Sequence, residues 1–185
     1  MIGILRYNAG NTGSVQRALT RLNIPSKIIE KPEELARMDG IIFPGAGAAG
    51  TAMQSLLETG WAEVIQSYRK PFLGLCLGMQ LLFEFSEEDS VPCLGIIKGR
   101  VTELPDTLAK PHMGWNKLST GDFAYFVHSF VCEPTDPSVT TMTTAYGDDL
   151  CAGVQQRNFF GVQWHPEKSG EVGEAYLLSF SKLCK

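Results

Sequence analysis

The feature that most constrains the fold is an apolar run that ends in a cysteine placed between two glycines. Residues 72–75 are apolar or glycine, Cys76 follows, and Gly74 and Gly78 stand two positions to either side of it. Residues 79–85 continue with a helix-like apolar pattern. Because glycine lets the backbone turn sharply, this order predicts a strand, a tight turn and a helix, with the cysteine presented at the turn. Cys76 is therefore a candidate nucleophile, and the rest of the chain must supply a base and an oxyanion hole.

The first half of the chain repeats this alternation of short apolar runs and amphipathic segments. The runs predict strands at residues 2–7, 26–29, 40–43 and 72–75. The segments between them predict a helix that Ser14 caps, one through residues 53–57 and one over residues 61–68. Short, wholly apolar strands separated by helices indicate a parallel sheet that is covered on both sides. Such sheets bind ligands at the carboxyl ends of their strands. Glycine-rich turns follow three of these ends, at residues 8–13, 44–47 and 74–78.

The second half of the chain differs, because it has little helix between its apolar runs. Strands are predicted at residues 99–104, 124–131, 139–146, 152–156 and 159–164. Successive strands without helices between them favour an antiparallel addition. A last helix is predicted from an apolar stripe at residues 172, 176, 177, 180 and 183. The predicted fold class is α/β, a mostly parallel central sheet flanked by helices with an added antiparallel β portion, in one domain over residues 1–185.

Composition and charge argue against several broad classes of protein. The formal net charge is −4 and no long run of Lys or Arg occurs, which argues against nucleic acid or an anionic membrane as the main partner. No apolar stretch reaches the roughly 20 residues that span a bilayer, and the first residues predict a strand rather than a signal peptide. The cysteines are odd in number and form no C-x-x-C pair, so neither a disulfide framework nor a zinc site is predicted. We expect a cytoplasmic protein that needs no metal and no organic cofactor.

A thiol nucleophile needs a base, and His165 is the strongest candidate among the three histidines. Pro166 disfavours helical geometry at the residue before it, so the chain is expected to be extended at His165. Residues i and i+2 of an extended chain face the same side, which would place Glu167 beside His165. The sequence therefore predicts a Cys-His-Glu triad, in which His165 takes the proton of Cys76 and Glu167 orients the imidazole.

The other two histidines lack such a partner. His128 lies in the apolar run 124–130, and no acidic residue stands two positions away from it. His112 follows Pro111 in a predicted loop, also without a nearby acid. A structural or interface role is therefore favoured for both.

Two backbone amides are candidates for the oxyanion hole. The amide of Leu77 follows the nucleophile at the predicted start of a helix, where backbone N–H groups are free. The turn at residues 44–47, Pro-Gly-Ala-Gly, lies at a neighbouring carboxyl end and could present the N–H of Ala46. The same turn is equally typical of an ordinary strand-to-helix connection.

Together these motifs resemble those of the class I (triad) glutamine amidotransferases, and the resemblance covers nearly the whole chain. Residues 74–80, Gly-Leu-Cys-Leu-Gly-Met-Gln, match the nucleophile motif of the family, and residues 161–167, Gly-Val-Gln-Trp-His-Pro-Glu, match its His-Pro-Glu motif. Within the family the chain is similar to the glutaminase subunits of imidazole glycerol phosphate synthases. This narrower resemblance is carried by residues 7–11, 44–47, 111–116, 125–129 and 168–169.

The resemblance implies that the chain hydrolyses L-glutamine to glutamate and ammonia through a thioester on Cys76. It also implies a heterodimer with a (β/α)8-barrel cyclase subunit, which receives the ammonia and makes imidazole glycerol phosphate in histidine biosynthesis. By resemblance the glutamine-binding residues are Gly45, Gln80, Glu88, Ser129 and Phe130. By resemblance the residues that face the partner are Asn11, Trp115, Tyr125, His128 and Lys168.

Three alternatives stay open on the sequence alone. The chain could be the glutaminase subunit of another amidotransferase, for pyridoxal phosphate or anthranilate synthesis, which co-purification with a different synthase would indicate. It could be a cysteine peptidase or deglycase on a similar sheet, which turnover of peptides without turnover of glutamine would favour. It could also be a catalytically silent binding subunit, in which Cys76 would not react with an electrophilic glutamine analogue.

Overall fold

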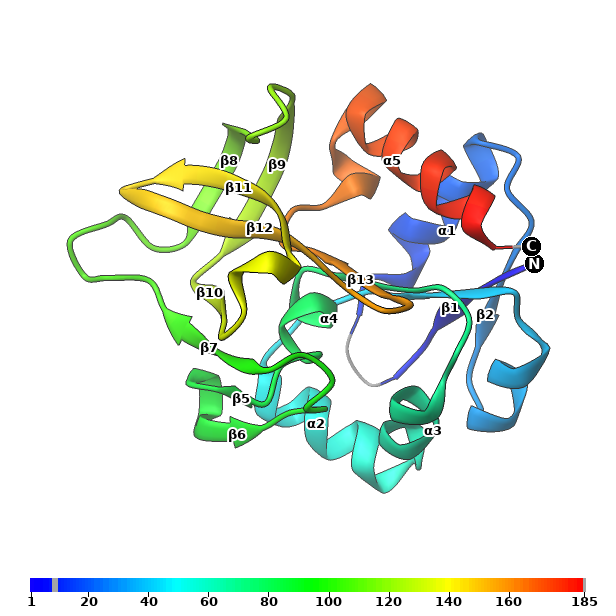
Figure 1. Ribbon diagram of the computed structural model, residues 1–185. Coiled ribbons are helices and arrows are strands. Elements are labelled where there is room, and N and C mark those ends of the chain that lie inside the picture. Colours follow the sequence, from blue (N-terminus) through cyan, green and yellow to red (C-terminus); the bar gives the residue numbers. More distant parts are fainter. Residues whose placement is uncertain (8–9, 185) are drawn as a thin grey trace.

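The computed structural model describes residues 1–7 and 10–184, whose strands form a large central sheet with helices on both sides (Figure 1). Residues 8 and 9, part of the turn predicted over 8–13, lie outside the described residues. The first half of the chain, with η for 3-10 helices, contains β1 (Ile2–Leu5), α1 (Thr12–Arg21), β2 (Ser26–Ile29), η1 (Pro32–Arg37), β3 (Gly40–Phe43), α2 (Ala49–Glu58), α3 (Trp61–Ser67), β4 (Phe72–Leu75) and α4 (Leu77–Gln80). The second half contains β5 (Phe85–Ser86), η2 (Glu88–Ser90), β6 (Val91–Pro92), β7 (Gly99–Glu103), β8 (His112–Lys117), β9 (Phe123–His128), β10 (Phe130–Pro134), η3 (Pro137–Val139), β11 (Thr140–Tyr146), β12 (Asp148–Gln156), β13 (Phe159–Val162), η4 (Pro166–Lys168) and α5 (Gly170–Leu183).

The sheet joins a parallel half to a mostly antiparallel half. Its strand order is β2-β1-β3-β4-β13-β12-β10-β7-β5-β6, with β11 paired to β12. Strands β2, β1, β3, β4 and β13 are parallel neighbours, whereas β13, β12, β10 and β7 pair antiparallel. Strands β8 and β9 form a hairpin outside this sheet. The predicted fold class, a mostly parallel sheet with an antiparallel addition, is confirmed.

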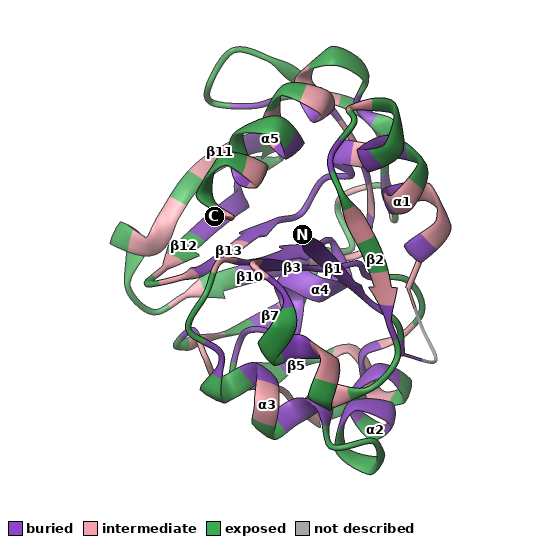
Figure 2. Cartoon of the chain, turned by 90° about the vertical axis from the view of Figure 1, so that its right-hand side faces the viewer, coloured by how far each residue is buried: buried purple, intermediate pink, exposed green. Residues whose placement is uncertain are grey.

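Strands β1, β3 and β4 are buried on both faces, because helices cover the sheet on both sides and alternate residues of a strand point to opposite faces. In β3, Ile41 and Phe43 join a core cluster with residues of α2 and α3, whereas Ile42 joins a second cluster with residues of α1 and α5. Figure 2 shows the buried strands β1 and β3 between these helix layers. In the part of the chain that the structure describes, no helix is both long and apolar enough to cross a membrane.

Some predicted boundaries are confirmed and others are wrong. The strands at residues 26–29, 40–43 and 72–75 have the predicted bounds. The helix after Cys76 is shorter than predicted, since α4 ends at Gln80 and the last residue of the predicted helix, Phe85, begins β5. Ser14 does not cap α1, because Asn11 does so by accepting the Ser14 N–H at 3.3 Å. The strand predicted over 124–131 is two strands, β9 and β10, separated by Ser129.

Candidate active site

Cys76 stands at the turn between β4 and α4 in a backbone conformation that residues other than glycine rarely adopt. Its φ is +51° and its ψ is −114°, and such a conformation persists only where the surrounding structure holds it. The Cys76 N–H donates to the carbonyl oxygen of Val162 at 2.8 Å, which ties the turn to β13. The turn therefore presents the thiol at the carboxyl edge of the parallel strands, where the sequence predicted a nucleophile.

The glycines around Cys76 are required by close contacts between main-chain segments. A Cβ on Gly74 would lie 2.6 Å from the carbonyl carbon of Gly78. A Cβ on Gly78 would overlap the carbonyl oxygen of Phe43, and one on Gly45 would lie 2.5 Å from the nitrogen of Leu77. The turns that follow β3 and β4 are thus packed backbone against backbone, which only residues without a side chain permit.

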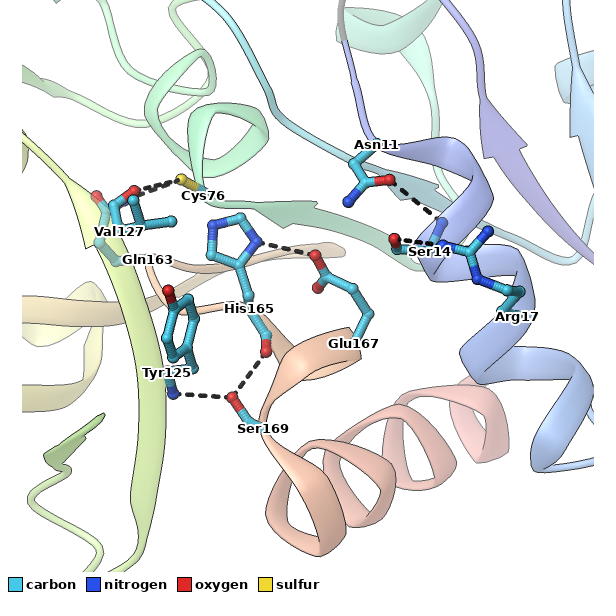
Figure 3. A network of polar contacts seen from close by, with 10 residues as sticks. All are labelled: Asn11, Ser14, Arg17, Cys76, Tyr125, Val127, Gln163, His165, Glu167 and Ser169. Carbon is cyan, nitrogen blue, oxygen red and sulfur yellow. Dashed lines mark hydrogen bonds and ion pairs between the residues drawn. The ribbon is translucent and has the colours of Figure 1, made fainter. Parts of the chain in front are cut away.

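His165 follows β13, the strand beside β4, and its imidazole and main chain are both held. Its Nδ1 lies 2.9 Å from Oε1 of Glu167, whose side chain is 2% exposed. The His165 N–H donates to the carbonyl oxygen of Tyr125 at 2.9 Å. The Ser169 hydroxyl donates to the His165 carbonyl oxygen at 2.7 Å and accepts from the Tyr125 N–H at 2.9 Å. Figure 3 shows the imidazole ring lying between Cys76 and Glu167.

The predicted pairing of His165 with Glu167 is present, but its geometry differs from the prediction. His165 is extended, with φ −104° and ψ 95°, whereas Glu167 lies in the 3-10 helix η4. Pro166 begins that helix, because its fixed φ and missing N–H suit a first helical position. The carboxylate therefore reaches the imidazole from a helical turn and not across two residues of a continuous extended segment.

The environment of His165 favours its protonated form. Burial lowers the pKa of His165, but the Cys76 sulfur and the Glu167 carboxylate outweigh burial and raise the pKa above its usual value. The buried Nε2 has no hydrogen-bond partner among the described residues, so it is available to a molecule that enters the site. A protonated imidazole beside a cysteine is the arrangement that generates a reactive thiolate.

Two groups that the sequence did not single out contact the Cys76 sulfur. The Gln163 side-chain N–H donates to Sγ at 3.6 Å, and the thiol donates to the carbonyl oxygen of Val127 at 3.8 Å. Gln163 stands two residues before the extended His165, and residues i and i+2 of an extended segment face the same side, so this spacing could have pointed to Gln163. The contact with Val127 could not be predicted from the residue type, because only the main-chain oxygen of Val127 contacts the sulfur.

Cys76 lines a cavity of about 380 Å³. The predicted residues that line this cavity are Asn11, Gly45, Ala46, Cys76, Leu77, Gln80, Glu88, His128, Ser129, Phe130, His165 and Lys168. The lining residues that were not predicted are Gly47, Pro111 and Val127. Glu167 lies behind His165, and Trp115 and Tyr125 lie outside the lining. Within residues 1–7 and 10–184, no group of three or more His, Cys, Asp and Glu side chains could hold a metal ion.

Glu88 lines the cavity from η2 and also caps the N-terminus of α2. Its Oε2 accepts the Ala49 N–H at 2.9 Å, where Ala48 at the N-cap offers no side-chain acceptor. Burial raises the pKa of Glu88, the Ala49 hydrogen bond opposes this shift and the Asp89 charge adds to it. A partly buried carboxylate at a cavity wall is suited to bind a cationic group such as an ammonium.

His112 and His128 form a buried hydrogen-bonded pair. His112 lies in β8 and not in a loop as predicted, and it is in register with His128 of β9. His128 Nδ1 lies 2.8 Å from the Phe130 carbonyl oxygen, so this nitrogen carries the hydrogen. His128 Nε2 then accepts from His112 Nδ1 at 3.0 Å, and His112 Nε2 accepts from Asn116 Nδ2 at 3.2 Å. Burial lowers the pKa of His128 to about 4, which keeps it neutral at pH 7.

Comparisons of the sequence with known proteins identify its family. The profile of the family described as "Glutamine amidotransferase class-I" matches residues 5–182. The chain is 41% identical over 204 residues to "Imidazole glycerol phosphate synthase subunit HisH" of Bacillus subtilis (strain 168), with 99% of this chain and 96% of the relative covered. A relative of the same name from Bacteroides fragilis (strain YCH46) is 40% identical over 196 residues, with 98% of this chain and 99% of the relative covered.

Solved structures share the fold. A glutamine amidotransferase crystal structure superposes with a TM-score of 0.81 at 22% identity, covering 99% of this chain and 98% of that one. The structure of PurLQS from Thermotoga maritima superposes with a TM-score of 0.72 at 20% identity, covering 100% of this chain and 98% of that one. At these identities the likeness shows the fold alone.

Proposed function

The chain belongs to the class-I glutamine amidotransferases, and from this premise we propose that it is the glutaminase subunit of an imidazole glycerol phosphate synthase. It hydrolyses L-glutamine to glutamate and ammonia and passes the ammonia to a cyclase subunit. The narrower assignment is supported by the relatives at 41% and 40% identity over almost their whole length. The observation that carries the chemistry is the Cys76 thiol at a cavity wall with the His165–Glu167 pair beside it.

In the first half of the reaction Cys76 is the nucleophile. Its thiolate attacks the side-chain amide carbon of glutamine, a sulfur–carbon bond forms, and the carbonyl electrons move onto oxygen. The N–H group of Leu77 holds this oxyanion together with that of Ala46, which in the structure contacts the Tyr7 hydroxyl. The protonated imidazole of His165 donates its Nε2 proton to the amide nitrogen, which leaves as ammonia. The raised pKa of His165 supports this role, since it keeps the ring protonated beside the Cys76 sulfur before the attack.

In the second half of the reaction water hydrolyses the thioester. The neutral His165 takes a proton from the water, the oxygen bonds to the carbonyl carbon, and the carbon–sulfur bond breaks with its electron pair returning to sulfur. Glu167 keeps the imidazole oriented through the 2.9 Å contact with Nδ1. Gly45, Gln80, Glu88, Ser129 and Phe130, which line the same cavity, hold the glutamine.

The partner is a cyclase subunit that docks over the mouth of the cavity. Ammonia reacts as a nucleophile only while it is unprotonated, so its release to solvent would waste it. The surface of the β8–β9 hairpin supports such docking, because Met113, Trp115 and Phe123 are 66%, 57% and 54% exposed. Trp115 packs edge-on against Tyr125 at 6.2 Å, and Lys168 of the cavity wall lies 5.8 Å from the centre of the Tyr125 ring. An exposed apolar face next to a cavity rim is typical of an interaction site.

The test is glutamate release from glutamine by the chain alone and by the chain with a cyclase subunit and its ribonucleotide substrate. We expect release to rise when the cyclase is added and to be lost in Cys76→Ala and His165→Ala variants of the same complex. Cys93→Ala is the matched control, since Cys93 is a free cysteine that does not line the cavity. Undiminished release by the Cys76→Ala complex would refute the mechanism. Binding and stimulation by a different synthase, and not by the cyclase, would refute the partner assignment.

A further inference from the structure

Gln163 lies buried beside Cys76 and has no part in the mechanism above. Its exposed fraction is 0%. Val162 of β13 is in register with Leu75 of β4, so Gln163 and Cys76 leave two neighbouring parallel strands at the same level. The Gln163 Nε2 lies 3.6 Å from the Cys76 sulfur, and its Oε1 lies 3.0 Å from Nε2 of Gln80. One buried amide thus connects the sulfur to the wall of the cavity.

The direction of these hydrogen bonds is determined by a main-chain carbonyl. Nε2 of Gln80 lies 3.0 Å from the carbonyl oxygen of Phe130, and a carbonyl oxygen only accepts. The NH2 end of Gln80 therefore faces both Phe130 and Gln163. The atom that Gln163 turns toward Gln80 must then be its oxygen, and its own NH2 end must face Cys76. Reversing the amide of Gln163 would bring two NH2 groups together and leave an oxygen against the sulfur.

The two polar neighbours of the sulfur act in opposite directions. The Val127 carbonyl oxygen, at 3.8 Å, can only accept the proton of a thiol, so its contact is lost when Cys76 ionises. The Gln163 N–H donates to sulfur, and a hydrogen bond to a charged acceptor is stronger than one to a neutral acceptor. Gln163 therefore favours the thiolate, which is the form that attacks glutamine and the form that leaves when the thioester is hydrolysed.

We propose that Gln163 is a further catalytic residue, whose side-chain N–H stabilises the Cys76 thiolate in both halves of the reaction. Gln80 acts through it as a positioning residue, because its Nε2 holds the Gln163 amide with the donor toward sulfur. The proposal rests on the proposed function for the identity of the nucleophile. It does not depend on which molecule the thiolate attacks, and the test below uses that independence.

Two variants separate the donor from the shape of the side chain. Gln163→Met removes the donor and keeps a long unbranched side chain, whereas Gln163→Glu keeps the shape and the acceptor for Gln80 but turns an oxygen toward the sulfur. Gln155→Met is the matched control, because Gln155 is exposed on β12 and does not line the cavity. The readout is the alkylation rate of Cys76 by iodoacetamide at pH 7, followed by mass spectrometry of the peptide that contains Cys76, in the chain with its cyclase partner.

We expect alkylation of Cys76 to be about tenfold slower in Gln163→Met, the effect of losing one hydrogen bond to a charged group. It should be slower still in Gln163→Glu, and Gln155→Met should react at the wild-type rate. Cys93 and Cys184 interfere little, because burial raises their pKa to about 12 and about 11. In steady-state assays, Gln163→Glu should lower kcat for glutamine at least tenfold with little change in KM, since the contact to Gln80 is kept.

Wild-type alkylation rates in both Gln163 variants, with melting temperatures equal to that of the wild type, would overturn the proposal. If Gln163→Met fails to fold, the isosteric Gln163→Glu variant decides alone. Failure of the proposed function gives a different result. In that case Gln163 would still control the alkylation rate of Cys76, but neither wild type nor variants would release glutamate from glutamine.

Discussion

Replacement of Gly74 by alanine tests whether the nucleophile turn depends on close backbone packing. A Cβ on Gly74 would lie 2.6 Å from the carbonyl carbon of Gly78 and 2.7 Å from the nitrogen of Met79, whereas real Cβ contacts essentially never fall below 3.0 Å. The Cβ would lie closer still to the Gly78 carbonyl oxygen, so the main chain of the turn must move by more than about 0.4 Å, and no rotamer change can relieve the contact. Overpacking of this kind costs about 1–3 kcal/mol. In a domain of this size each kcal/mol lowers the melting temperature by roughly 2–4 °C.

The same movement shifts the Cys76 sulfur relative to His165. Because a misplacement of about 1 Å can cost roughly 100-fold in rate, we expect kcat for glutamine hydrolysis to fall about tenfold. The assay measures thermal unfolding and glutamate release on the same preparations, with the cyclase present for the second. The control is Gly13→Ala in α1, where a Cβ would meet only the flexible end of Arg17, at 3.4 Å. This control should raise stability by up to about 1 kcal/mol. A Gly74→Ala variant with the wild-type melting temperature and kcat would show that the turn does not depend on close backbone packing at Gly74.

Three further predictions concern polar groups around the cavity. Burial lowers the pKa of His128 to about 4 in the folded chain. The free energy of unfolding should therefore be highest above about pH 6.5, where His128 is neutral in both states, and should fall by up to about 3 kcal/mol as the pH is lowered toward 4. Urea unfolding of His128→Asn should therefore show a flatter pH dependence in that window, and an unchanged slope would contradict this account. Burial also raises the pKa of Glu88, so Glu88→Gln should be at least as stable as the wild type at pH 7. The KM for glutamine should rise about tenfold in this variant, because a charge-assisted contact with the substrate is lost. An unchanged KM would argue against contact between Glu88 and the substrate. Ser169→Ala removes the hydroxyl that joins the His165 carbonyl to β9. It should lower the free energy of unfolding in urea by about 1–3 kcal/mol and should lower kcat. Ser181→Ala is the control and should change neither quantity, because the Ser181 hydroxyl contacts a carbonyl of its own helix.

The parallel half of the fold was predictable because its signals are local. Residues 40–43 and 72–75 are short apolar runs bounded by turn-forming residues, and both became strands with the predicted bounds. The antiparallel half was predicted less well, because its boundaries depend on pairing partners far away in the chain. The run 124–131 has no strong turn signal, yet it breaks at Ser129, since β9 pairs with β8 outside the main sheet and β10 pairs with β7 and β12 inside it.

His112 illustrates how long-range packing overrides a local signal. Pro111 before it and Gly114 after it favour a loop. In the structure His112 is part of β8, and its ring stacks on Phe126 at 4.8 Å and on Tyr146 at 4.0 Å. Those two rings come from β9 and β11, so no short window of sequence around His112 contains the interactions that make it a strand residue.

Which chemistry is available, and how the nucleophile turn is built, could be inferred from local stretches of the amino-acid sequence. Gly74 and Gly78 allow the backbone to turn within a few residues, and a thiol and an imidazole are side chains of the types that can act as nucleophile and base. The meeting of these groups, in contrast, depends on the folded arrangement of the strands. Cys76 and Gln163 are 87 residues apart and come into contact because β4 and β13 are parallel neighbours, an order set by the burial of apolar side chains throughout the sheet. The strand order also sets the orientation of the buried Gln163 amide. Its oxygen accepts from Gln80, and the Gln80 amide is itself oriented by the carbonyl oxygen of Phe130 in β10.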